Sequence, residues 1–107
     1  MENKMKKSIE QLIQETTQWD FPFFASIKKK KEILTEKKGY LEEQLQQVAP
    51  ELFPSKTELE KLWTEAVAWA QEPFASLPEK NRLNGFYLQE LMHSYGEKIA
   101  DWMMDHT

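Results

Sequence analysis

Four segments of this 107-residue chain carry apolar residues three or four positions apart, which is the period of an amphipathic α-helix. The last segment shows it most clearly, because one face holds seven large apolar side chains: Leu88, Leu91, Met92, Tyr95, Ile99, Trp102 and Met103. A helix with one apolar face is stabilised by packing that face against another element. Four such segments with short connectors predict one all-α domain over residues 1–107, folded as an up-and-down antiparallel four-helix bundle.

The composition argues against a sheet and against several kinds of site. Seven residues are Ile or Val and three are Gly, whereas 60 of the 107 are strong helix formers. The absence of Cys excludes disulfides and thiolate metal sites. No apolar run reaches the roughly 18 residues of a membrane span, so we expect a cytoplasmic protein. The excess of Lys over Arg, 13 to one, suggests a bacterial source with an AT-rich genome.

Prolines and capping residues set the expected helix boundaries, which lie near residues 4–18, 22–49, 56–71 and 80–105. Pro22 suits the first turn of the second helix, with Asp20 or Phe21 as its cap. Ser55 and Glu58 have the spacing of a capping box at the start of the third.

Gly39 leaves one boundary open. The run Lys37-Lys38-Gly39-Tyr40 also matches a helix end with glycine in the left-handed conformation. A break there would add a fifth short helix. The alternative is a second helix that continues to residue 49, before Pro50.

Aromatic residues outside the main apolar faces are candidates for binding a protein partner. Trp69 lies about 90° from the centre of its helix's apolar face, and Phe74 follows in the next connector. The simpler interpretation is that this connector folds back over Trp69; the alternative is an exposed anchor. Ile33 and Tyr40 form a second small apolar stripe on the second helix, which suggests a further contact with a partner or a second copy.

His93 is a candidate phosphoacceptor. The run His93-Ser94-Tyr95-Gly96 resembles histidine phosphotransfer domains, which are four-helix bundles of about this length with an exposed phosphorylated His. The resemblance implies a relay component that uses His93. That family places Lys three and Gly four residues after the His, whereas Gly96 and Glu97 hold those positions here, and Glu97 would repel a phosphate. The simpler interpretation is a solvated pair of His93 and Glu97, one helical turn apart.

The spacing of Glu90 and His93 also occurs among the ligands of di-iron bundles. Those sites need two such pairs and two more carboxylates, but this chain has two His in all. We therefore expect no metal site and no cofactor. The single Arg argues against chorismate mutase, an all-α enzyme whose dicarboxylate substrate needs several cationic groups, and no small-molecule substrate is evident.

Residues 28–38 contain six lysines against two glutamates, the densest positive charge in the chain: Lys28, Lys29, Lys30, Lys31, Lys37 and Lys38. One hypothesis is non-specific contact with nucleic acid or an anionic surface. The simpler one is a solvated helix face, with Lys30 and Lys31 extending past the core to water. Tyr40 is the one aromatic near enough to stack on bases, which argues against nucleic acid.

Together these patterns predict a small interaction or regulatory protein without catalysis, which binds a protein partner or self-associates. A phosphorelay component and an anion-binding protein are the alternatives.

Overall fold

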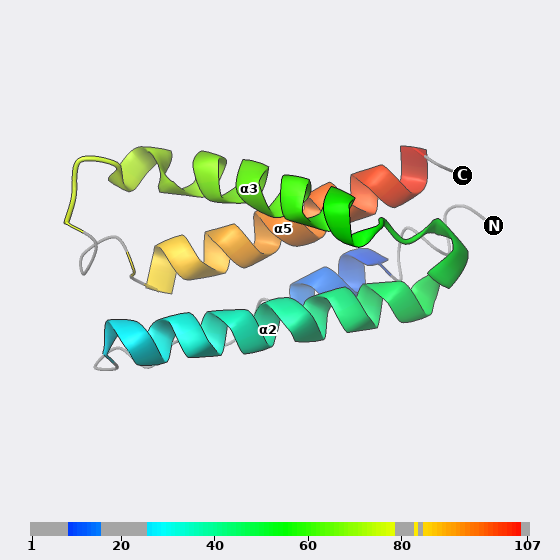
Figure 1. The fold of residues 1–107 in the computed structure, drawn as a ribbon, viewed down its shortest axis with the longest axis horizontal. Coiled ribbons are helices and arrows are strands. Elements are labelled where there is room, and N and C mark those ends of the chain that lie inside the picture. Colours follow the sequence, from blue (N-terminus) through cyan, green and yellow to red (C-terminus); the bar gives the residue numbers. More distant parts are fainter. Residues whose placement is uncertain (1–8, 16–25, 79–82, 84, 106–107) are drawn as a thin grey trace.

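The computed structural model describes residues 9–15, 26–78, 83 and 85–105, and all structural statements refer to these. They form an all-α bundle, as predicted (Figure 1). Residues 9–15 are helical, and α2 (Ile27–Val48), α3 (Lys56–Gln71) and α5 (Gly85–Asp105) follow. Short 3-10 turns, η1 (Pro50–Leu52) and η2 (Glu72–Phe74), follow α2 and α3. Successive helices run in opposite directions along a long axis of 44 Å.

α5 is the helix against which the others pack (Figure 1). Its contact with α3 is the most extensive in the described molecule, and α2 packs on it as well. The apolar face of α5 is almost fully buried at Leu88, Leu91, Met92, Tyr95, Ile99 and Met103. Ile9, Ile13, Leu41, Leu45 and Ala66 bring the other helices to the same core.

Gly96 lets the first helical segment approach α5 closely. A Cβ atom at this position would lie 3.0 Å from Ile13 Cγ1 and 3.4 Å from Leu41 Cδ2. Gly96 is therefore the point where residues 9–15, α2 and α5 meet. Gly39 differs, because a Cβ there would meet nothing within 4 Å.

The start of α3 was predicted correctly and the start of α2 was not. The Ser55 hydroxyl accepts a hydrogen bond from the Glu58 N–H at 3.3 Å, so α3 begins where the capping spacing placed it. α2 begins at Ile27 and not near residue 22, because Ser26 is extended and its hydroxyl accepts from the Lys29 N–H at 3.2 Å. The expected cap at Asp20 or Phe21 lies outside the described residues.

α2 is continuous through Gly39, since no described residue has the positive φ that a left-handed helix end requires. The fifth helix considered for a break at Gly39 therefore does not form.

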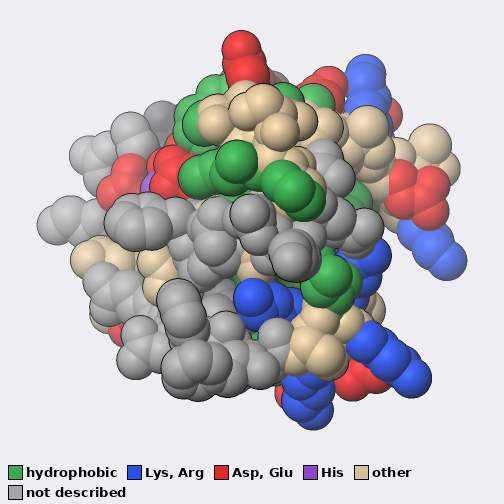
Figure 2. All heavy atoms as spheres, turned by 90° about the vertical axis from the view of Figure 1, so that its left-hand side faces the viewer, with side chains coloured by type: hydrophobic (Ala, Val, Ile, Leu, Met, Phe, Trp, Pro, Cys, Tyr) green, Lys and Arg blue, Asp and Glu red, His purple; other side chains and the backbone are tan. Residues whose placement is uncertain are grey.

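Lysine side chains occupy the right-hand and lower parts of the end view in Figure 2, and hydrophobic side chains gather in its upper half.

Candidate functional site

The C-terminal end of α3 places two aromatic side chains beside α5. Pro73 cannot continue the α-helix, and the chain tightens into η2, where the Ala75 N–H donates to the Glu72 carbonyl at 3.3 Å. This turn directs Phe74 back toward α5, where its ring meets Tyr87 edge-on at a centroid distance of 6.1 Å. Phe74 is half-buried, so part of its ring stays accessible.

Trp69, one helical turn earlier, is not covered. Its side chain is 54% exposed, the highest fraction among the described large hydrophobic residues. The expectation that the connector folds back over Trp69 is therefore wrong. The physical reason is that η2 directs Phe74, and not the rest of the connector, onto the bundle. An exposed indole on a surface helix is the feature expected of a binding anchor.

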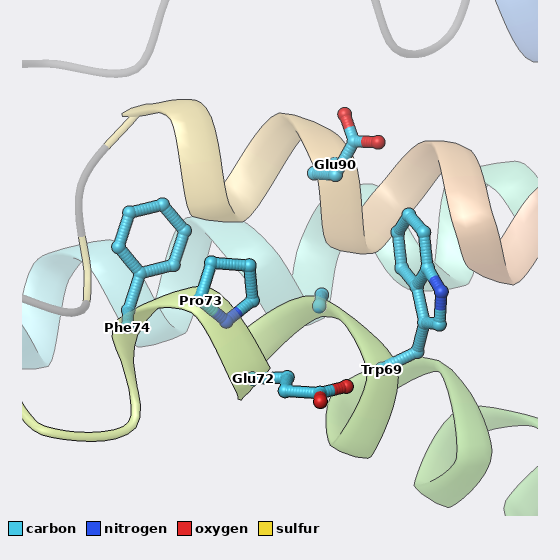
Figure 3. Close-up of a pocket in the computed structure, with 6 residues that line it drawn as sticks. Trp69, Glu72, Pro73, Phe74 and Glu90 are labelled. Atoms are coloured by element: carbon cyan, nitrogen blue, oxygen red, sulfur yellow. The ribbon is translucent and has the colours of Figure 1, made fainter.

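A hollow of about 550 Å³ lies between these two aromatics (Figure 3). Trp69 and Phe74 stand at its opposite ends, with Pro73 between them. Glu90 borders it on the α5 side and Glu72 on the η2 side. The volume is within the usual range of ligand pockets, about 300–1,000 Å³. The hollow thus combines an apolar base with a carboxylate on each side.

A second hollow, of about 430 Å³, continues from Trp69 along α5. Trp69 and Glu90 line both hollows, and the second adds His93, Glu97, Lys98 and Asp101. Here Lys98 pairs with Glu65 of α3, with 3.9 Å between Nζ and Oε2. The two hollows form one groove between α3 and α5, which we call the Trp69 groove.

His93 lies where the sequence predicted. Its side chain is 46% exposed, and its Nε2 lies 2.6 Å from Oε1 of Glu97. Gly96, which follows His93 by three residues, leaves no open space beside it for a phosphoryl group, because Ile13 packs against it. The structure thus shows the solvated pair of His93 and Glu97 that the spacing predicted. The space beside Gly96 is filled by the Ile13 side chain.

Ile33 and Tyr40 lie on α2, away from the Trp69 groove. Tyr40 is 51% exposed and Ile33 is half-buried. Neither lines a hollow that includes Trp69 or Phe74. The four candidate partner-binding residues therefore belong to two separate surfaces, and only Trp69 and Phe74 share a concave one.

The lysine-rich segment divides between structural and exposed side chains. Lys30 donates from Nζ to the Leu83 carbonyl at 2.9 Å, and this tie is partly buried. Lys28, Lys29 and Lys31 are exposed, and Lys37 is half-buried. Of the lysines in this segment, Lys30 thus has a backbone partner within the bundle. The prediction placed the Lys30 ammonium group in water past the core, whereas the structure binds it to the Leu83 carbonyl.

Lys38, one of the six candidate anion-binding lysines, packs against the bundle. Its ammonium group lies 3.0 Å from Oε2 of Glu42 and 5.2 Å from the centre of the Trp63 ring, and its side chain is only 27% exposed. It also lies 5.5 Å from the centre of the Tyr95 ring. Lys38 is therefore partly buried, with its charge paired to Glu42 and its ammonium group beside two aromatic rings.

Tyr95 completes this cluster, which we call the Lys38 cluster: Lys38, Glu42, Trp63 and Tyr95. The Tyr95 hydroxyl donates to Oε2 of Glu42, and its ring meets Trp63 edge-on at 4.9 Å. Burial, with the Glu42 hydrogen bond and charge, raises the pKa of Tyr95 far above its ordinary value. In the sequence, Lys38 interrupts the apolar positions Leu34, Leu41 and Leu45 of the same helix, which is a local signal for the cluster.

Two negative findings apply to the described residues. No group of three or more His, Asp or Glu side chains there has the arrangement to hold a metal ion. No described helix is both long enough and apolar enough to cross a membrane.

Comparison with protein-family models, with curated proteins and with solved structures finds no match for this chain.

Proposed function

We propose that this chain is a non-catalytic interaction protein that binds a protein partner through the Trp69 groove. The observation that carries the proposal is the 54% exposure of Trp69 at the edge of a concave surface that it shares with Phe74. Tryptophan is enriched among residues whose truncation costs most at protein interfaces. A partner side chain in the hollow would cover both aromatics at once.

The lining residues favour binding over catalysis. The groove offers carboxylates, one His–Glu pair and one Lys–Glu pair, all at exposed or half-exposed positions. Catalytic acids and bases are usually set apart by burial or by a close charge that shifts their pKa. Tyr95, whose pKa is raised by burial and by Glu42, lies in the Lys38 cluster and does not line the groove.

A peptide-display selection tests the proposal. Random peptides are selected on the wild-type chain and then tested on Trp69→Ala and Tyr40→Ala. These variants remove aromatic side chains of similar exposure, 54% and 51%, from different surfaces. Circular dichroism establishes that both variants stay folded, which we expect for exposed positions.

We expect peptides that bind the wild type and Tyr40→Ala but lose binding to Trp69→Ala. A selection in which no peptide depends on Trp69 would overturn the proposal. Peptides that depend on Tyr40 instead would assign the interaction to the outer surface of α2.

A further inference from the structure

The lining of the Trp69 groove holds more acidic than basic side chains. Four carboxylates line its two hollows: Glu72, Glu90, Glu97 and Asp101. The two potentially cationic groups in the lining are already paired, His93 with Glu97 and Lys98 with Glu65. Glu72, Glu90 and Asp101 form no ion pair with another described residue. Within the described part of the chain, three of the four lining carboxylates therefore carry negative charge with which no cation forms an ion pair.

The apolar base lies between these charges. Pro73 and Phe74 line the first hollow together with Glu72 and Glu90 (Figure 3). Ala70 lines it as well, and Trp69 lines both hollows. An apolar side chain would fit the hollow, while cationic groups on either side of it would meet the carboxylates. The exposed indole face is also a favourable contact for a Lys or Arg side chain.

From this arrangement we infer that the partner presents a basic amphipathic segment, with an apolar anchor for the hollow and Lys or Arg beside it. The inference rests on the proposed function, because it names the chemistry of the partner at the same groove. Nucleic acid, anionic lipid and acidic peptides carry the charge that the groove repels. A small polyamine supplies positive charge but no apolar group for the space between Trp69 and Phe74.

The charge of the selected peptides gives the first test. We expect the Trp69-dependent peptides to be enriched in Lys and Arg around a large apolar residue. Trp69-dependent peptides that are neutral or acidic would overturn this inference and leave the proposed function standing. A selection without any Trp69-dependent peptide would overturn both.

The second test measures the affinity of the tightest Trp69-dependent peptide by isothermal titration calorimetry. The double variant Glu72→Gln/Glu90→Gln should weaken binding by about tenfold or more, because two facing charges are lost. The control Glu36→Gln/Glu43→Gln makes the same change in net charge on exposed positions of α2, and should leave the affinity within about twofold. Equal effects of the two double variants would show that only net charge matters and would overturn the inference.

The competing occupants have distinct signatures. Sedimentation of the chain alone at rising concentration would reveal a dimer that Trp69→Ala dissociates if a second copy fills the groove. Spermidine would be assigned to the groove if it displaced the peptide, bound as tightly as the peptide does, and lost its own binding in Trp69→Ala. Either result would overturn the inference, whereas a monomer and weak spermidine competition are expected.

Discussion

The hydroxyl of Tyr95 on α5 donates a hydrogen bond to the carboxylate of Glu42 on α2. The two residues are 53 positions apart, and the bond joins two helices at a point where Tyr95 has no exposed surface. Lys38 lies on the same carboxylate and over the Trp63 ring. This contact fixes how α2, α3 and α5 meet, and it makes stability depend on pH in a predictable way.

Stability should fall at alkaline pH. Burial and Glu42 raise the pKa of Tyr95 above its ordinary value of 10.0. Above pH 10 an unfolded chain loses this proton while the folded chain keeps it, so the unfolded state binds fewer protons. The free energy of unfolding then decreases by about 1.4 kcal/mol per pH unit from this group. Urea unfolding from about pH 8 to pH 11 measures the decrease.

The variant Tyr95→Phe isolates this contribution. It should unfold about 1–2 kcal/mol more easily at pH 7, because Glu42 loses a donor, and its alkaline decline should be shallower than that of the wild type. Tyr40→Phe is the control, since Tyr40 is exposed. An identical alkaline slope in Tyr95→Phe and wild type would contradict the assignment.

Lys38→Ala should destabilise the bundle, although alanine is the best helix former and lysine is usually a surface residue. The variant loses the ion pair with Glu42 and the contacts with the Trp63 and Tyr95 rings, together worth about 1–2 kcal/mol. Lys29→Ala is the matched control at an exposed position of the same helix and should change stability by less than about 0.5 kcal/mol. Thermal unfolding compares the two, and equal stabilities would argue against the Lys38 cluster.

The two helical glycines should respond differently to alanine. Gly39→Ala should raise the free energy of unfolding by about 0.5–1 kcal/mol, because its Cβ enters open space and alanine is the better helix former. Gly96→Ala should not show this gain, since its Cβ would press on Ile13 at 3.0 Å. Gly96→Val should be clearly destabilising, by about 1–3 kcal/mol. Denaturant titrations of the three variants would refute the close packing at Gly96 if all were equally stable.

His93 should not accept a phosphoryl group. The Glu97 carboxylate lies 2.6 Å from its Nε2 and would repel a phosphate, and the nearby glycine is filled by Ile13. Incubation with acetyl phosphate should add no phosphoryl mass to the wild type or to His93→Gln. Mass spectrometry at neutral to mildly alkaline pH, where phosphohistidine survives, is the measurement. Phosphorylation of the wild type that is absent in His93→Gln would support the relay alternative.

Local sequence signals predicted the helix boundaries that depend on interactions between neighbouring residues. Ser55 and Pro73 bracket α3 because a cap and a missing N–H act on their own neighbours. The same reasoning chose Pro22 for the start of α2, while the hydroxyl of Ser26 caps the helix in the structure. Two start signals lay within one short segment, and helical period alone does not choose between them.

The features that could not be predicted from the sequence depend on contacts between residues that are far apart in the chain. The position of Lys38 among the apolar residues of α2 can be read from the sequence, but its partners Trp63 and Tyr95 are set by the packing of three helices. The position of Trp69 off the apolar face was also visible, whereas its exposure depends on where η2 directs the chain. The carboxylates of the Trp69 groove come from η2 and α5, so no single stretch of sequence displays their charge.

The central position of α5 also has a consequence for the order of folding. The helices made earlier on the ribosome bury their apolar faces mainly against α5, which is synthesised after them. Until α5 has emerged, Leu41, Leu45 and Ala66 lack the surface that covers them in the finished bundle. The nascent chain is therefore open to chaperones until α5 has been synthesised, and cooperative folding follows the emergence of α5 from the ribosome.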